Sequence, residues 1–274
     1  MIDKILTNEI NFPDNDCALL LSGGVDSISV GFGAHRLGKE ITAYSFCLDT
    51  HTSYDYLKAK EVCEIMGWQF VGVEIPTANL VDDWYRLMKF GCEKKTHYEC
   101  LYPFLYVYPE IKEKYVLTGL GADGYYGNTN WGQRKPWQLK ESKENFDAYR
   151  DFYFSPEQAG HSKDREMAEE HNKILITPYR AEPVKDYFYQ FDYFQLNNPK
   201  QKNHIREAFA KEFGLVGKIK NHQPLQGKVS KVSELFETLI ENKEINFKRR
   251  SRVMDMCRDW RKLNKVENTL KEFL

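Results

Sequence analysis

A run of aliphatic residues that ends directly in a glycine turn is the feature that most limits how this chain can fold. The segment from Cys17 to Val30 reads CALLLSGGVDSISV. Its continuous apolar part, Cys17 to Leu21, is typical of a parallel strand that is covered on both faces. Helical spacing follows from Ser27 to Leu37. A strand that passes through two glycines into a helix predicts the first unit of an α/β fold.

Strands and helices alternate along the first half of the chain. Further strands are predicted over 41–48, 68–75 and 115–118, and the intervening helices over 54–66, 80–90 and 97–108. This order predicts a doubly wound parallel sheet with right-handed crossovers, followed by a helical C-terminal layer. Ligands in such folds bind at the carboxyl ends of the strands. Both glycine-rich turns of the sequence follow directly on predicted strands.

The chain divides into three parts by pattern. Residues 1–128 form the predicted α/β core, and residues 129–161 are polar and aromatic without a defensible period, which indicates a loop or an active-site flap. Residues 162–274 are mainly helical and are expected to complete the active site. The helices of this last part are predicted over 164–172, 183–194, 199–213, 230–240 and 250–273.

Charge and cysteine content exclude several classes of protein. Lys and Arg number 39 against 40 Asp and Glu, so no overall field attracts nucleic acid or anionic lipid. No apolar run approaches the ~20 residues that span a bilayer, and the N-terminus lacks a signal-peptide layout. We therefore expect a cytoplasmic protein without a membrane partner, and nucleic acid is not the expected ligand. The six cysteines include no CxxC pair, which argues against a zinc ribbon or an iron–sulfur cluster.

The first turn, SGGVDS, has the composition of a phosphate cradle. Gly23 and Gly24 allow backbone N–H groups to converge, and the following helix directs its positive dipole end toward the same point. Ser22 and Ser27 add hydroxyl groups. The turn matches neither GxxxxGK[ST] nor GxGxxG. Asp26 would repel a phosphate unless a divalent cation lies between them, so this acid suggests a Mg²⁺ site. Alternatively, Asp26 only stabilises its helix, as acids in a first helical turn commonly do.

SGGVDS resembles the SGGxDS signature of the N-type ATP pyrophosphatase, or PP-loop, superfamily. The resemblance implies a Rossmann-like fold of the adenine nucleotide alpha hydrolase type, in which ATP is cleaved between its α and β phosphates. It also implies that backbone near Phe46, Leu21 and Gly119 holds the adenine. The residues that would bind ATP and pyrophosphate are Leu21, Ser22, Gly23, Gly24, Val25, Asp26, Ser27, Phe46, Gly119 and Gly121.

The second turn, YVLTGLGADGYYGN over 115–128, is similar to the second motif of the asparagine synthetase C-terminal domain and its β-lactam synthetase relatives. That motif is a strand followed by SGxGxDExxxGY, and Thr118, Gly119, Gly121, Asp123 and Gly127 fall in register with it. The resemblance implies that Asp123 joins Asp26 in holding Mg²⁺ and pyrophosphate. The family glutamate that follows this aspartate is Gly124 here.

Weaker similarity continues downstream. TPYR at 177–180 lies where the family has R-x-P-F-L-D, and KNHIREAF at 202–209 resembles its K-x-x-L-R-x-A-F helix. The family places a catalytic lysine after that helix, where it stabilises charge on the α-phosphate. The corresponding stretch here, over 217–228, offers Lys220 as the first candidate and Lys228 as the second.

The resemblance predicts an AMP-forming amide-bond synthetase. Such an enzyme adenylates a carboxylate substrate, releases pyrophosphate and transfers the acyl group to ammonia or an amine, with ATP and Mg²⁺ as cofactors. Full asparagine synthetases begin with a glutaminase domain and its nucleophilic cysteine, whereas this chain begins Met1-Ile2-Asp3, so a separate glutaminase is a candidate partner. Two alternatives stay open: a PP-loop enzyme that activates a ring carbonyl of a nucleobase or tRNA, and a nucleotide-binding protein without turnover.

Overall fold

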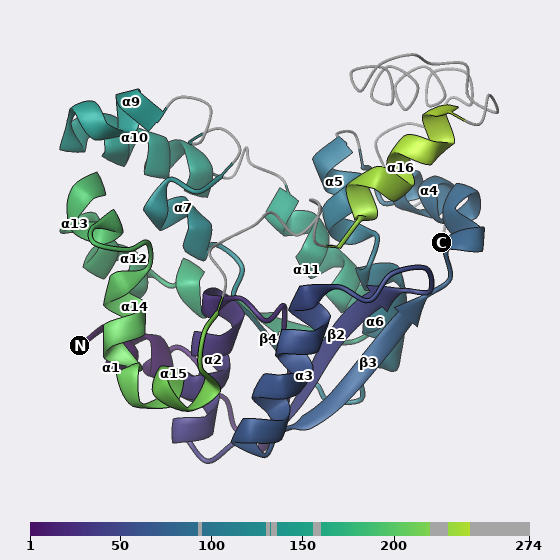
Figure 1. Ribbon diagram of the computed structural model, residues 1–274, viewed down its shortest axis with the longest axis horizontal. Helices are drawn as coiled ribbons and strands as arrows, with labels where there is room; N and C mark the ends of the chain where they lie inside the picture. The colour runs from purple at the N-terminus through teal and green to yellow at the C-terminus, as the bar shows by residue number, and fades with distance from the viewer. Residues whose placement is uncertain (93–94, 130–131, 133–135, 156–159, 220–229, 242–274) are drawn as a thin grey trace.

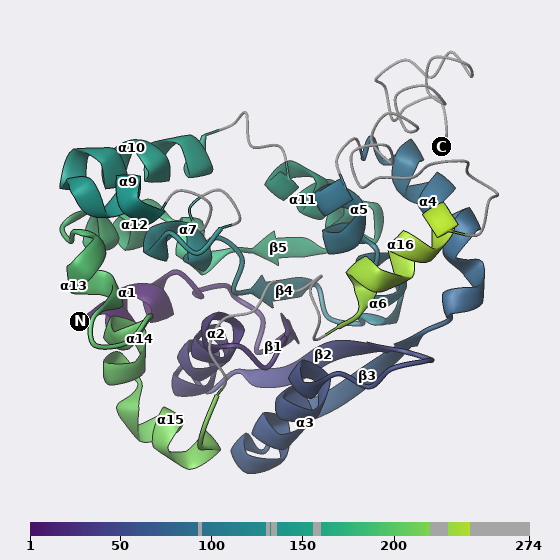
Figure 2. The same cartoon turned by 45° about the horizontal axis from the view of Figure 1, so that its top comes forward.

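Five parallel strands form one sheet in the order β3-β2-β1-β4-β5 (Figures 1 and 2). The computed structural model describes residues 1–92, 95–129, 132, 136–155, 160–219 and 230–241. The strands are β1 (Asp16–Leu20), β2 (Glu40–Leu48), β3 (Gln69–Ile75), β4 (Tyr115–Thr118) and β5 (Ile174–Ile176). The predicted doubly wound α/β fold is therefore confirmed.

Helices cover both faces of this sheet. The first hydrophobic core contains α1 (Ile2–Asn8), α2 (Val25–Arg36), α3 (Tyr54–Met66), α7 (Ala122–Tyr126), α9 (Pro136–Glu141), α10 (Lys143–Phe154), α12 (Glu182–Tyr189), α13 (Tyr193–Asn197), α14 (Asn203–Ala208) and α15 (Ala210–Val216). The second contains α4 (Leu80–Lys89), α5 (Lys95–Leu101), α6 (Phe104–Glu110), α11 (Gly160–Glu170) and α16 (Val232–Glu241). Two short 3₁₀ helices, η1 (Thr77–Asn79) and η2 (Pro178–Arg180), each follow a strand.

Alternation along the strands separates the two cores. Leu19 of β1 and Leu117 of β4 belong to the first core, whereas their neighbours Ala18 and Val116 belong to the second. All four side chains are fully buried. Because successive side chains of a strand point to opposite faces, these strands bury apolar residues on both faces, which explains the apolar run of β1.

The mainly helical second half of the chain also contains a strand, β5, that the sequence pattern did not predict. β5 pairs in parallel with β4 and adds an edge strand to the sheet. Its three residues are too few to display a period. The helix predicted over 97–108 is also divided, because α5 ends at Leu101 and α6 begins at Phe104, directly after Pro103.

Among its described residues, the segment predicted as a loop or flap contains helices α9 and α10. The Ser142 side chain caps α10 by accepting a hydrogen bond from the backbone N–H of Asn145 at 3.1 Å. Phe146 and Tyr149 of α10 are buried in the first core, so packing stabilises a sequence whose own periodicity is weak. The three-part division of the chain stays a prediction, and the helix predicted over 250–273 lies outside the described residues.

None of the helices in the described ranges combines the length and the apolar character that crossing a membrane requires.

Two helical glycines should respond to the same substitution in opposite ways. A Cβ at Gly31 of α2 would lie 2.5 Å from Trp68 Cη2 and 2.8 Å from Leu19 Cδ2, so Gly31→Ala should lower the free energy of unfolding by about 1–3 kcal/mol. At Gly214 of α15 a Cβ would meet no described atom within 4 Å. Gly214→Ala should therefore raise stability by up to about 1 kcal/mol. Urea unfolding of both variants tests this, and equal effects would contradict the packing of α2 on the sheet.

Asp164 of α11 should make stability depend on pH. It is 8% exposed, its Oδ1 has no hydrogen-bond partner among the described residues, and burial raises its pKa to about 7. Between pH 4 and 7 the unfolded chain releases this proton while the native chain retains it, so stability falls as pH rises. Asp164→Asn should be the more stable protein, with a gap that widens by about 2–3 kcal/mol between pH 5 and pH 8 in urea unfolding. A constant gap would refute this.

Candidate active site

The first glycine turn lies at the carboxyl end of β1 and leads into α2. Leu21 extends the strand by donating its backbone N–H to Tyr44 O at 2.9 Å. Gly23 has a φ of 68°, and a Cβ there would lie 2.5 Å from Asp55 O, so no other residue fits without displacing α3. Gly24 is the N-cap of α2. The hydroxyl oxygens of Ser22 and Ser27 lie 3.1 Å apart across the turn.

The second glycine turn packs directly against the first. A Cβ at Gly119 would lie 2.6 Å from Ser27 N and 2.7 Å from the carbonyl carbon of Asp26. Gly121 has a φ of 100° and is the N-cap of α7, which carries Asp123 in its first turn. Close backbone contact, which only glycine permits at position 119, therefore brings the starts of α2 and α7 together.

One ammonium group joins the two predicted metal-binding aspartates. Lys202 Nζ donates to Asp26 Oδ2 at 2.5 Å and to Asp123 Oδ1 at 2.8 Å. The three side chains are 5%, 15% and 29% exposed, respectively. Lys202 is the N-cap of α14 and has a left-handed backbone with φ 61°. The structure thus brings Asp26 and Asp123 to one point and adds a cation from a third segment.

Burial and mutual charge set the protonation of this cluster. Burial raises the pKa of Asp26 to about 6, and the negative charge of Asp123 adds to this while Lys202 opposes it. Burial alone would lower the pKa of Lys202, but the two carboxylates outweigh burial and raise it. At neutral pH the ammonium is therefore charged and reduces the repulsion between the two acids.

The oxygen atoms of this cluster fit a magnesium ion. Asp26 Oδ1 is buried and has no hydrogen-bond partner within the described ranges, so one lone-pair direction is left unused. That part of the chain holds no group of three or more histidine, cysteine or acidic residues suited to a metal ion. Mg²⁺ does not need one, because it takes one or two carboxylates together with substrate phosphates and water. The metal-binding roles of Asp26 and Asp123 stay predictions.

The remaining predicted residues are placed as follows. Leu21 and Val25 are buried at the start and end of the first turn, and Phe46 is half-buried on β2 against the second core. Their predicted contacts with ATP are untested. The predicted catalytic lysines, Lys220 and Lys228, lie outside the described residues.

Sequence reasoning missed the role of Lys202. Its signal was present, because Lys202 opens the KNHIREAF segment. Only the fold shows that a residue 176 positions from Asp26 reaches that carboxylate. Arg206, one turn further along α14, adds positive charge, which acts to lower the pKa of Asp26.

Comparison with known proteins shows the family to which this chain belongs. The family model described as asparagine synthase matches residues 12–260. A carboxyethyl-arginine beta-lactam-synthase from Streptomyces clavuligerus is 29% identical to this chain over 138 residues. The aligned region covers 49% of this chain and 26% of that protein, so the chain matches about a quarter of the length of this curated relative.

Replacing Lys202 should expose the competition between its ammonium and a metal ion. Lys202→Met leaves two facing carboxylates without their cation and should lower the free energy of unfolding by about 3 kcal/mol. Millimolar Mg²⁺ should then raise the melting temperature of the variant more than that of the unmodified protein, because no ammonium competes for the oxygens. Adding Asp26→Asn to Lys202→Met should remove the Mg²⁺ response. Equal responses in all three proteins would contradict a metal site here.

Proposed function

Because this chain belongs to the asparagine synthase family, we propose that it is an ATP-dependent, AMP-forming ligase that makes a carbon–nitrogen bond. Its substrates are a small-molecule carboxylate and ammonia or an amine. The observation that carries this proposal is the convergence of Asp26, Asp123 and Lys202 beside the first glycine turn. Two acids and a cation at the N-terminus of a helix suit a metal-bound triphosphate better than any neutral ligand.

The first step activates the carboxylate. A carboxylate oxygen attacks the α-phosphorus of ATP, the bond from that phosphorus to the bridging oxygen breaks, and pyrophosphate leaves. The product is an acyl-adenylate. Mg²⁺ held by Asp26 and Asp123 would neutralise the pyrophosphate charge. With a metal bound to the two carboxylates, Lys202 would pair with phosphate oxygens instead, and the backbone N–H groups of Gly23 and Gly24 would donate to the same anion.

The second step forms the amide. The nitrogen nucleophile attacks the acyl carbon, the bond from that carbon to the AMP oxygen breaks, and the nitrogen loses a proton. Lys220 remains our first candidate for stabilising charge on the α-phosphate and Lys228 the second. We further propose that the ammonia comes from solution or from a separate glutaminase.

Pyrophosphate release tests the proposal. The purified protein with ATP and Mg²⁺ should release pyrophosphate and AMP in equal amounts when the correct acid from a carboxylate panel is added with ammonia or an amine. Asp26→Asn and Asp123→Asn should each reduce kcat/KM about 100-fold or more, because each removes a negative charge that would hold the Mg²⁺ bound to the pyrophosphate. Lys211→Met, at an exposed site on α15, is the control and should leave the rate unchanged.

Two results would refute this function. One is ATP binding, measured by calorimetry, without pyrophosphate release for any acid and nitrogen donor. The other is release of ADP and phosphate instead of AMP and pyrophosphate, because that would place the attack at the γ-phosphorus.

A further inference from the structure

A groove opens at the amino ends of the strands, away from the two glycine turns at their carboxyl ends. Its volume is about 610 Å³, which lies within the roughly 300–1,000 Å³ of small-ligand sites. Its walls come from the beginnings of β1, β2 and β3 and from the turns that follow α2 and α3. α2 carries Asp26 in its first turn and His35 in its last. The groove and the candidate active site therefore lie at opposite ends of the same helix.

Three carboxylates line this groove. Asp16 begins β1 and Glu40 begins β2, and the two residues are direct partners in the parallel register of these strands. Register partners point to the same face of a sheet, so the two negative charges stand side by side. The third acid, Glu113, lies two positions before β4. No ion pair joins any of the three acids to a cation among the described residues.

Glu113 leaves one carboxylate oxygen unused. The residue is 9% exposed, so water reaches little of it. Its Oε2 accepts hydrogen bonds from the Tyr44 hydroxyl at 2.9 Å and from the backbone N–H of Lys112 at 3.2 Å. Its Oε1 has no hydrogen-bond partner within the described ranges. A nearly buried carboxylate is costly unless its oxygens are bonded, so this one calls for a donor from outside the chain.

The basic side chains of the groove are engaged elsewhere. Lys39 Nζ donates to the carbonyl oxygens of Phe12 and Asp14 at 2.8 Å and 2.6 Å, and it lies 4.4 Å from the ring centroid of Phe12. His35 Nδ1 accepts a hydrogen bond from Trp68 Nε1 at 3.3 Å, so this nitrogen carries no proton. The lining thus holds three carboxylates against one ammonium, and that ammonium is bound to backbone oxygens.

Two helix C-termini add to the negative potential. α2 and α3 both end at the groove, and helix C-termini carry partial negative charge on their last carbonyl groups. α3 has no basic residue in its last turn, and Arg36 at the end of α2 pairs with two acids outside the groove. At Gly38 and Gly67, which follow these helices, an added Cβ would meet no described atom within 4 Å. The groove is therefore both negative and open.

We propose that this groove binds a small aliphatic diamine. One ammonium group would donate to Glu113 Oε1, and the other would lie between Asp16 and Glu40. An ammonium suits these acids because it carries a full charge and three donors. The methylene chain would pack on the apolar part of the lining, Met66 and Trp68. A metal ion fits less well, because the described chain holds no group of three or more histidine, cysteine or acidic residues suited to one. This site does not depend on the proposed function.

Tryptophan NMR signals test the site without any turnover. In protein labelled with ¹⁵N-tryptophan, 1,4-diaminobutane should shift the indole N–H signal of Trp68 saturably, whereas 1,4-butanediol, or MgCl₂ at equal ionic strength, should not. Trp68→Phe identifies the signal. Glu113→Gln should weaken diamine binding about tenfold or more, because it removes the charge but keeps an acceptor for the Tyr44 hydroxyl. Glu40→Gln, at an exposed position, should weaken binding about threefold and serves if Glu113→Gln does not fold.

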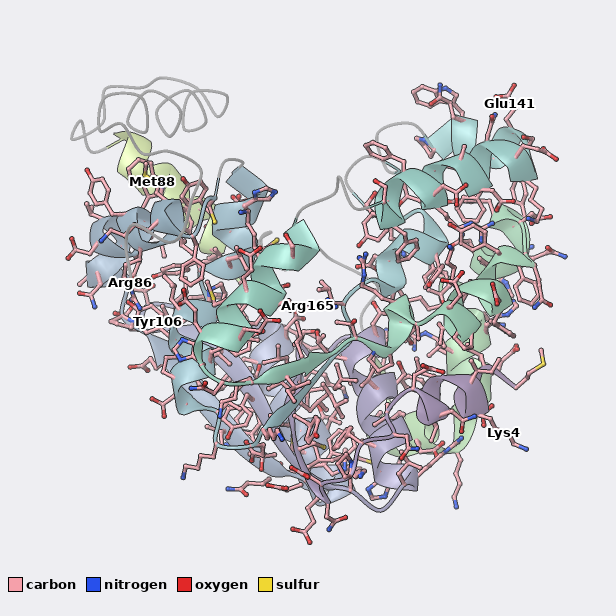
Figure 3. The ribbon with its side chains drawn as sticks, turned by 180° about the vertical axis from the view of Figure 1, so that it is seen from behind. Lys4, Arg86, Met88, Tyr106, Glu141 and Arg165 are labelled. Carbon is pink, nitrogen blue, oxygen red and sulfur yellow. The ribbon has the colours of Figure 1, made fainter. Side chains whose placement is uncertain are left out.

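Two control variants locate the binding. Glu141 ends α9, at the opposite end of the molecule from the C-terminus of α3 (Figures 1 and 3). Glu141→Gln is the charge-matched control and should bind the diamine as the unmodified protein does. Asp26→Asn should also leave diamine binding unchanged, which separates this groove from the candidate active site. Absence of a saturable shift, an equal shift with MgCl₂, or undiminished binding by the folded Glu113→Gln and Glu40→Gln variants would overturn the site.

Discussion

Repulsion between two carboxylates is the constraint on which the candidate site depends. Asp26 and Asp123 are held together by backbone packing at Gly119 and can both ionise only when a cation lies between them. Lys202 supplies that cation, with hydrogen bonds of 2.5 Å and 2.8 Å. The lysine thus holds the two acids of the candidate site at one point, and it does so from a segment 79 positions beyond Asp123.

The sequence predicted the strands of the sheet more completely than the helices around it. The central strands are buried on both faces, so their apolar runs predicted them, whereas β5 is a three-residue edge strand with nothing to repeat. α10 was missed for a different reason. Its stability comes from burying Phe146 and Tyr149 against residues far away in the sequence, which leaves only a weak pattern within the helix itself.

The site residues also differ in whether a local sequence pattern could predict them. Asp26 and Asp123 were predicted because each follows a strand within a recognisable glycine turn, so local pattern and parallel-sheet topology together placed them at one edge. Lys202 opens the KNHIREAF segment, but no local pattern shows that it reaches these acids. Its position depends on how α14 packs on the first half of the chain, through tertiary contacts such as the hydrogen bond that Arg36 Nη2 donates to Ala208 O at 3.4 Å.

The three charged residues of the candidate site, Asp26, Asp123 and Lys202, are synthesised at different times. Asp123 and Lys202 are separated by 79 positions, which a ribosome takes roughly 4–16 s to add at 5–20 residues per second. During that interval the nascent sheet carries two converging acids without their lysine. A cation, or a nucleotide bound to one, would neutralise these acids in the growing chain, so the supply of such ions during synthesis bears on how new copies fold.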